Sequence, residues 1–307
     1  MSPDDFFTQV EPRRRPRRRK LAVAGITVVV IAGAAGLVSA KDQVRELMAT
    51  VESALPGIGP VPEETEAVDA RPEELGPFED SRAENYANGA AGLVMPPAKA
   101  MYGLSKKDVA AALKRVKQLM IASHLDRTTV LGGRPKAFID LLVPEERAWF
   151  RKNLDRKSGF TAKDDFNTRA WVHSFAPKTA ELATDVVKVN GETTLARHPD
   201  GMKVTVNYLF VYAIQRPGQP RTRHRVVAHH LGEVHVSKQG GELVAWVYDW
   251  NTGSVTPARC DIDDGFTHPI YPDSPHDEVA AKATEQAGDP YRLDAGTSEN
   301  CTISEET

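Results

Sequence analysis

The longest apolar stretch of the chain runs from Leu21 to Ala40 and contains no charged side chain. These 20 residues would form a helix about 30 Å long, which matches the hydrocarbon thickness of a bilayer. The stretch therefore predicts a transmembrane helix over residues 21–40. The basic tail formed by residues 1–20 is expected to stay cytoplasmic, which places everything after the span outside the cytoplasm. We expect a single-pass protein of the cell membrane.

A cleaved signal peptide is the alternative interpretation of the same segment. Val38-Ser39-Ala40 fits the small-residue pattern of a cleavage site, and basic residues precede the apolar run. The run is longer than a usual signal-peptide core of about 7–15 residues, which favours a retained anchor. Both interpretations export the same domain.

Small residues recur on one face of the expected span. Ala32, Gly36 and Ala40 are four residues apart, a spacing that lets two membrane helices approach closely. Residues 41–55 continue with an apolar stripe that is typical of an amphipathic juxtamembrane helix. The pattern predicts a homodimer formed through the membrane helix. The alternative is that it reflects only an Ala- and Gly-rich composition.

An apolar period of three to four residues begins after Gly103 and predicts helices. Ser105 and Asp108 have the spacing of a capping box at the start of the first helix. Its apolar stripe consists of Val109, Leu113, Val116 and Met120. A second helix is expected from Pro135 to Leu142, and a third begins at Pro144.

After Gly159 the apolar period changes to two, which predicts strands. The expected strands are residues 169–176, 182–190, 193–197, 202–214, 224–236 and 243–250. The expected turns are Asn190-Gly191, Pro217-Gly218 and Gly240-Gly241. Helices followed by antiparallel strands indicate an α+β domain over residues 101–260.

The segments that flank this domain are acidic, whereas the domain is basic. Residues 56–100 are rich in Pro and Glu and predict an extended linker, and residues 261–307 form an acidic tail. The net charge of the whole chain is -3. That total conceals 26 basic against 15 acidic residues in 91–260, and two basic against 12 acidic residues in 261–307. A basic domain can attract anionic lipids or wall polymers.

The chain resembles a family of uncharacterised, single-pass, membrane-anchored proteins of actinomycete-type bacteria. The resemblance rests on the layout and on the segments IASHLDRTTVLGGRPKAFIDLLVPEERAWF and VTVNYLFVYAI. The order of helices before a curved sheet is similar to nuclear-transport-factor-2-like cone folds. Single-anchor proteins with such exported domains include secretion-scaffold and mammalian-cell-entry-associated membrane proteins. The resemblance implies a fold and no particular activity.

A cone fold of this kind implies a pocket between sheet and helices. The residues expected to line it are Tyr208, Tyr212, His230, Trp246 and Asp249. An Asp and a His in one cavity could perform acid–base chemistry, as an enzyme or small-ligand binder would require. The alternative is that the aromatic residues simply fill the core.

Two further groups of residues are candidates for function. Cys260 and Cys301 are the only cysteines, and in an oxidising compartment they predict one disulfide; the alternatives are free thiols or an intermolecular bridge. A basic patch is expected in one hairpin, formed by Arg216, Arg221, Arg223 and Arg225. Neutralisation of this patch by the acidic flanks is the alternative to binding a polyanion.

The histidines of one strand do not predict a metal site. Same-face pairs such as His224 with His230 would be about 20 Å apart, too far to share a metal ion. We expect no metal, no cofactor and, for an exported domain, no nucleic acid. The leading hypothesis is an envelope protein whose exported domain binds or scaffolds a partner: another envelope protein, an anionic lipid or a wall polymer. The alternative is an extracytoplasmic enzyme or small-ligand binder.

Overall fold

The computed structural model describes residues 75–156, 167–259, 261–274 and 289–294. Chain contacts divide the protein into two units, Met1–Asp69 and Ala70–Thr307, and all described residues belong to the second. The predicted basic tail, membrane span and juxtamembrane helix lie outside the described residues, as do Cys260 and Cys301. Within the described ranges, no helix combines the length and the apolar character needed to cross a bilayer.

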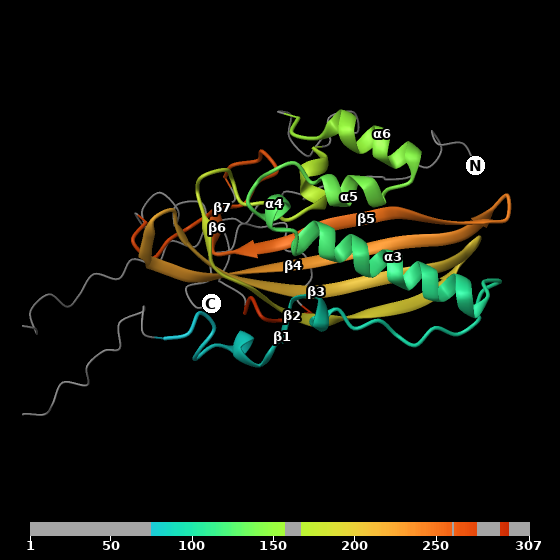
Figure 1. Ribbon diagram of the computed structural model, residues 1–307, viewed down its shortest axis with the longest axis horizontal. Coiled ribbons are helices and arrows are strands. Elements are labelled where there is room, and N and C mark those ends of the chain that lie inside the picture. Colours follow the sequence, from blue (N-terminus) through green and yellow to red (C-terminus); the bar gives the residue numbers. More distant parts are fainter. Residues whose placement is uncertain (1–74, 157–166, 260, 275–288, 295–307) are drawn as a thin grey trace, which may run out of the picture. The chain divides into compact units, whose positions relative to one another are not determined.

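The domain has the predicted α+β class, and its main sheet is an antiparallel meander (Figure 1). Neighbouring strands in the sheet are also consecutive in the chain. The strands are β1 (Ala87–Asn88), β2 (Glu181–His198), β3 (Gly201–Arg216), β4 (Gln219–Gln239) and β5 (Glu242–Thr256). Two short strands, β6 (Ala258–Arg259) and β7 (His268–Pro269), form a separate pair.

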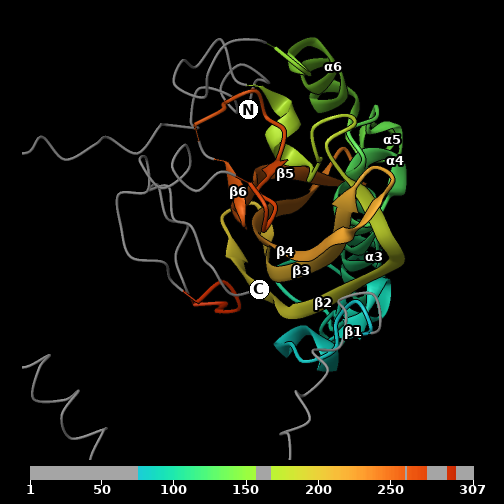
Figure 2. The same cartoon turned by 90° about the vertical axis from the view of Figure 1, so that its left-hand side faces the viewer.

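Four helices form a layer on one side of this sheet, which we call the helical layer. They are α3 (Lys106–His124), α4 (Arg127–Val130), α5 (Lys136–Leu141) and α6 (Pro144–Asn153). The predicted capping box is confirmed, since Ser105 Oγ accepts from the Asp108 amide and the Asp108 carboxylate accepts from the Ser105 amide. Figure 2, which looks along the strands, shows the sheet curving beside these helices.

The sheet buries side chains on both of its faces. The inner face packs against the helical layer, and its cluster includes Val204, Val206 and Phe210 of β3. The outer face has a smaller cluster that includes Leu209, Val211 and Phe78. Side chains alternate along β3, as the period of two predicts, so that even-numbered residues from Met202 to Ile214 belong to the inner cluster.

Two predicted strand features are wrong. Asn190-Gly191 is not a hairpin turn, because β2 runs straight through it and the chain reverses between His198 and Gly201. Gly191 instead permits a close approach to β3: a Cβ there would lie 2.2 Å from the Asn207 carbonyl oxygen. Residues 169–176 hold no strand; they begin with the 3-10 helix η3 (Thr168–Trp171).

The described part of the predicted linker, residues 75–100, packs against the domain. It contains the 3-10 helices η1 (Arg82–Asn85) and η2 (Gly89–Gly92), and β1 between them pairs with β2. Apolar side chains explain the difference, because Phe78, Ala83 and Leu93 are buried in the two clusters. Part of the acidic tail is also ordered: Tyr271 joins the inner cluster, whereas Tyr291 and Leu293 pack against the outer one.

Candidate functional site

Three of the five predicted pocket residues lie on the inner face and are fully buried. Tyr208 and Tyr212 on β3 and His230 on β4 have no exposed surface. The Tyr208 hydroxyl donates to the Val94 carbonyl at 2.9 Å, and the Tyr212 hydroxyl donates to the His124 carbonyl at 2.9 Å. Both hydroxyls therefore fasten neighbouring segments to the sheet, and these residues fill the core.

The other two predicted pocket residues lie elsewhere. Trp246 is paired with His235 across the β4–β5 ladder, and Asp249 is paired with Glu233. Both partners belong to the outer face, and Asp249 is exposed. A β-bulge between Glu233 and Val234 shifts the register of β5, which sequence spacing cannot reveal. The prediction of one pocket lined by all five residues is wrong.

The inner face instead brings together His124, His173 and His230, which we call the histidine cluster. None of the three is more than 1% exposed. The His124 ring centroid lies 4.4 Å from that of His230 and 6.4 Å from that of His173. Aromatic rings enclose the cluster: Phe210 stacks on His124 at 4.4 Å, and Tyr212 stacks on His173 at 4.5 Å.

The Ser123 hydroxyl contacts the His124 ring. It lies 2.8 Å from the Leu119 carbonyl and 2.7 Å from His124 Nδ1, and the donor in the second contact depends on the tautomer of the ring. Neither His124 Nε2 nor either ring nitrogen of His173 has a hydrogen-bond partner in the described structure.

Burial keeps His124 and His173 of the cluster neutral. Desolvation, with smaller effects of His230 and His173, holds the pKa of His124 well below its ordinary value. Desolvation alone lowers the pKa of His173 to about 3. Neutral rings enclosed in this way cannot exchange protons with solvent unless the core opens. The cluster is therefore a packing element that acid would disturb.

Glu146 is a second buried ionisable group, located on α6 and without exposed surface. Its Oε1 accepts from the Val247 amide at 2.6 Å, which satisfies a donor on the edge strand β5. Desolvation raises the pKa of this carboxyl well above its ordinary value, so its protonated form is favoured. Glu146 thus attaches α6 to the sheet.

The arginine patch expected in the β3–β4 hairpin is largely engaged by the chain itself. Arg216 forms an ion pair with Asp273 of the tail, and its guanidinium lies 4.3 Å from the Tyr271 ring centroid. Arg223 donates to the Leu75 carbonyl at 2.7 Å, and Arg225 donates to the Glu79 carbonyl at 3.3 Å. Arg221 is exposed.

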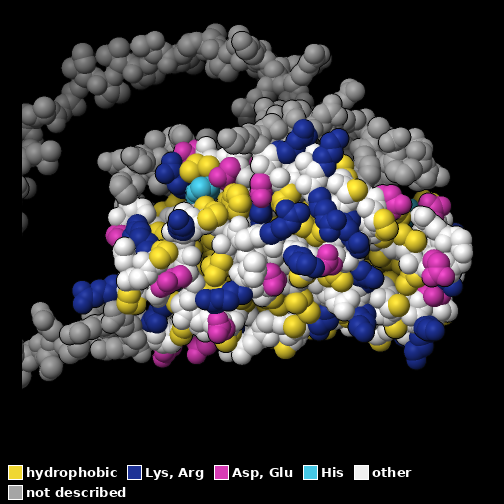
Figure 3. Space-filling view, turned by 45° about the horizontal axis from the view of Figure 1, so that its top comes forward, with side chains coloured by type: hydrophobic (Ala, Val, Ile, Leu, Met, Phe, Trp, Pro, Cys, Tyr) yellow, Lys and Arg dark blue, Asp and Glu magenta, His cyan; other side chains and the backbone are white. Residues whose placement is uncertain are grey.

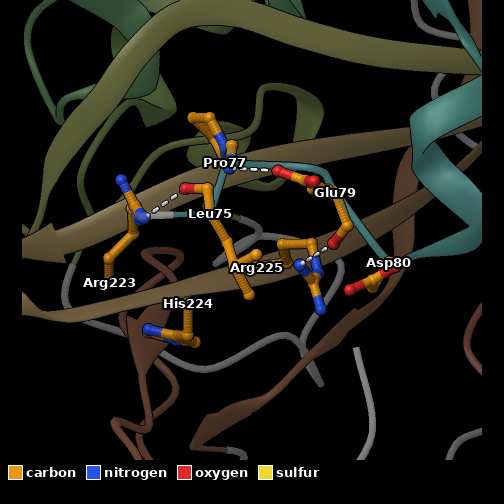
Figure 4. A pocket seen from close by; sticks show the side chains of 8 residues that line it. Leu75, Pro77, Glu79, Asp80, Arg223, His224 and Arg225 are labelled. Atoms are coloured by element: carbon orange, nitrogen blue, oxygen red, sulfur yellow. Dashed lines mark hydrogen bonds between the residues drawn. The ribbon is translucent and has the colours of Figure 1, made fainter. Parts of the chain in front are cut away.

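A pocket of about 260 Å³ lies where residues 75–80 cross β4 (Figure 4). Its lining includes Arg223, His224 and Arg225, together with Glu79 and Asp80. Desolvation, with help from the nearby Arg216 and Arg225, lowers the pKa of His224 to about 4. Since acidic and basic side chains share the pocket and both arginines donate to main-chain carbonyls, its polar groups mainly hold residues 75–80 on the domain.

Sequence reasoning missed His124, His173 and Glu146 as members of the core. One signal was available for His124, which continues the apolar stripe of α3 four residues after Met120. His173 falls in a segment predicted as a strand, and Glu146 follows another Glu in a helical first turn, where exposure is usual. Among the described residues, no three His, Cys, Asp or Glu side chains are grouped to hold a metal ion.

The fold and these contacts define an α+β domain with a mostly antiparallel sheet and a closed, aromatic inner face. Comparison with known proteins finds no matching family model, no matching curated protein and no matching solved structure.

Proposed function

We propose that this protein is anchored in the cell membrane by residues 21–40 and that its α+β domain, outside the cytoplasm, binds or scaffolds a partner. The apolar run and the basic residues before it support the anchor and its orientation. The disulfide between Cys260 and Cys301 belongs to the same proposal, because export would expose both thiols to an oxidising compartment.

The packing of the inner face is the observation that supports binding at the surface. Tyr208, Tyr212 and His230 are enclosed by other side chains and therefore cannot meet a ligand from solvent. Acid–base chemistry by His230 and Asp249 would require both in one accessible cavity, yet Asp249 lies on the outer side. The domain would therefore bind its partner at its exterior surface.

A cone fold similar to nuclear transport factor 2 is part of this proposal. It is supported by the order of the elements, with helices before a four-strand meander of long strands. The curvature of the sheet beside α3 also supports it (Figure 2).

Membrane fractionation tests the proposal directly. The full-length chain should stay in the membrane fraction after an alkaline wash, and protease added to spheroplasts should digest its α+β domain. Replacing Val29 and Val30 with Arg should release the protein into the soluble fraction or block its export, because each central Arg costs about 2.5–3.5 kcal/mol on insertion.

The matched control replaces the same two valines with Leu, which preserves the apolar run and should preserve membrane retention. A wild-type chain that the alkaline wash removes, or whose domain resists protease until the spheroplasts are lysed, would contradict the anchor or its orientation.

A further inference from the structure

The helical layer, together with the loops that connect its helices, is a strongly basic region of the domain. Residues 106–156 contain 12 Lys and Arg against six Asp and Glu, and one of those acidic residues is the buried Glu146. Figure 3, which turns the helical side toward the viewer, shows Lys and Arg side chains spread over this face. The layer is distinct from the arginine hairpin that the sequence points to.

Many of these charges have no carboxylate beside them. Five exposed basic residues of the layer make no ion pair or hydrogen bond with the described residues: Lys106, Lys107, Lys114, Arg134 and Lys152. Arg115 donates to the Leu141 carbonyl and to no carboxylate. Arg147 also donates to main-chain carbonyls, but it lies close enough to Asp140 to help lower the pKa of that carboxyl.

The acidic residues of the described tail are engaged on other parts of the domain. Asp273 pairs with Arg216 of the hairpin, and Asp289 pairs with Arg82 at 2.5 Å. The Leu293 carbonyl accepts from Asn207 on the outer face at 3.0 Å. Through these contacts, the described tail compensates basic side chains that lie outside the helical layer.

The layer also lacks the apolar side chains that a membrane-binding face inserts into lipid. In the described part of the chain, the exposed large hydrophobic residues are Val94 and Tyr102, and both precede α3. Lys107 and Lys114 lie two turns apart on α3, about 10 Å along its axis. A row of cations without an apolar insertion suits a linear polyanion better than a bilayer.

We propose that the helical layer binds a phosphate-bearing, linear polyanion, and that Lys107 and Lys114 of α3 contact it. The inference rests on the proposed function, since it names the partner of the binding domain. Attraction between exposed ammonium groups and phosphates in water is long-ranged, additive over many contacts and weakened by salt.

Long-chain inorganic polyphosphate is the probe for the test. The full-length chain, held in neutral-lipid nanodiscs, should bind it saturably at about 50 mM salt and lose most of that affinity at about 500 mM. The variant K107E/K114E should bind about tenfold more weakly or worse. The control R221E/K178E makes the same change in net charge at exposed sites outside the layer and should lose less than about twofold.

A second measurement needs no variant. Acetylation of lysines in the wild-type chain, read by mass spectrometry, should slow at Lys106, Lys107, Lys114 and Lys152 when polyphosphate is added. The rate at Lys188, which donates to the Glu84 carbonyl outside the layer, should not change.

Three results would overturn the inference. The first is no binding of polyphosphate, and the second is an equal loss of affinity in both variants. The third is that the chain binds added anionic vesicles more tightly than polyphosphate and that K107E/K114E weakens this vesicle binding. The last result would assign the layer to a membrane. Failure of the chain to enter nanodiscs would count against the anchor alone, because the same titration in buffer still tests the layer.

Discussion

Two sets of ionisable side chains, one on each face of the sheet, differ in burial. On the inner face, His124, His173 and Glu146 are buried, and desolvation favours their neutral forms. On the outer face, Lys203 pairs with Glu233 at 2.7 Å, and each side chain keeps close to a third of its surface exposed. Water still reaches this ion pair, whereas the three desolvated groups favour their uncharged forms.

This difference separates stability from recognition. The inner face determines whether the domain stays folded, and its ionisable groups make that stability depend on pH. The outer face and the helical layer carry the charges that solvent meets and that the proposed partner would meet. Four measurements test this difference between the two faces of the sheet.

Acidification should have the largest effect, because the lowered pKa values of His124 and His173 both make the fold less stable in acid. A histidine whose pKa is lowered by folding stabilises the fold fully above its unfolded pKa of about 6.5. That stability is lost as the pH falls below this value, because the unfolded chain then binds more protons. With a folded pKa of about 3 for His173, the loss at pH 5 is about 2 kcal/mol from this residue.

Urea unfolding at pH 7 and pH 5, followed by tryptophan fluorescence, measures this loss. The variant H173F should reduce the pH 7 to pH 5 difference by about 2 kcal/mol. The control V94A changes an exposed side chain and no ionisable group, and it should leave the difference unchanged. Identical pH dependence in H173F and the wild type would remove the distinction between the faces.

Removing the Glu146 carboxyl should cost about 2–3 kcal/mol, because E146A leaves the buried Val247 amide without an acceptor. E146Q retains a carbonyl acceptor and should lose much less. The pKa of Glu146 is raised, so its effect on stability depends on pH in the opposite direction to that of the histidines. The stabilising effect of Glu146 is present at low pH and is lost as the pH rises above about 4.5. E146Q should therefore abolish that part of the pH profile in urea unfolding.

Y212F should cost about 1 kcal/mol by removing the hydrogen bond to the His124 carbonyl while preserving the ring stack on His173. The same experiment with F210L removes a ring and no hydrogen bond, so the two variants separate polar from packing effects. Thermal unfolding of Y212F indistinguishable from the wild type would show that the hydroxyl contributes nothing to the inner face.

The outer face should give the smallest response. K203A removes the ion pair with Glu233 and should cost less than about 1 kcal/mol, since both groups are partly solvated. The cost should shrink further in high salt. A salt-independent loss of several kcal/mol in urea unfolding would mean that this pair behaves like the buried groups.

Local patterns predicted the elements whose stabilising contacts are themselves local. The capping box at Ser105, the α3 stripe and the Gly218 and Gly240 turns are all formed by residues close in sequence. The turn predicted at Asn190-Gly191 was wrong because cross-strand packing against β3 outweighed the local turn preference. Residues 75–100 pack on the domain because Phe78 and Leu93 are buried there. The composition of this segment, which is rich in Pro and Glu, does not reveal that packing.

The sequence by itself determined the α+β class, the main helices, the alternation along β3 and the basic character of the domain, because these depend on periodicity and composition. Which charged side chains are paired and which are exposed depends on the tertiary structure. It joined His124, His173 and His230 from three separate segments, and a bulge between Trp246 and Asp249 brought both residues onto the outer side. It also matched hairpin arginines with carbonyls and the tail while leaving Lys106, Lys107 and Lys114 of α3 exposed. Burial and pairing are properties of neighbours distant in the chain, and these set the charge state of each group.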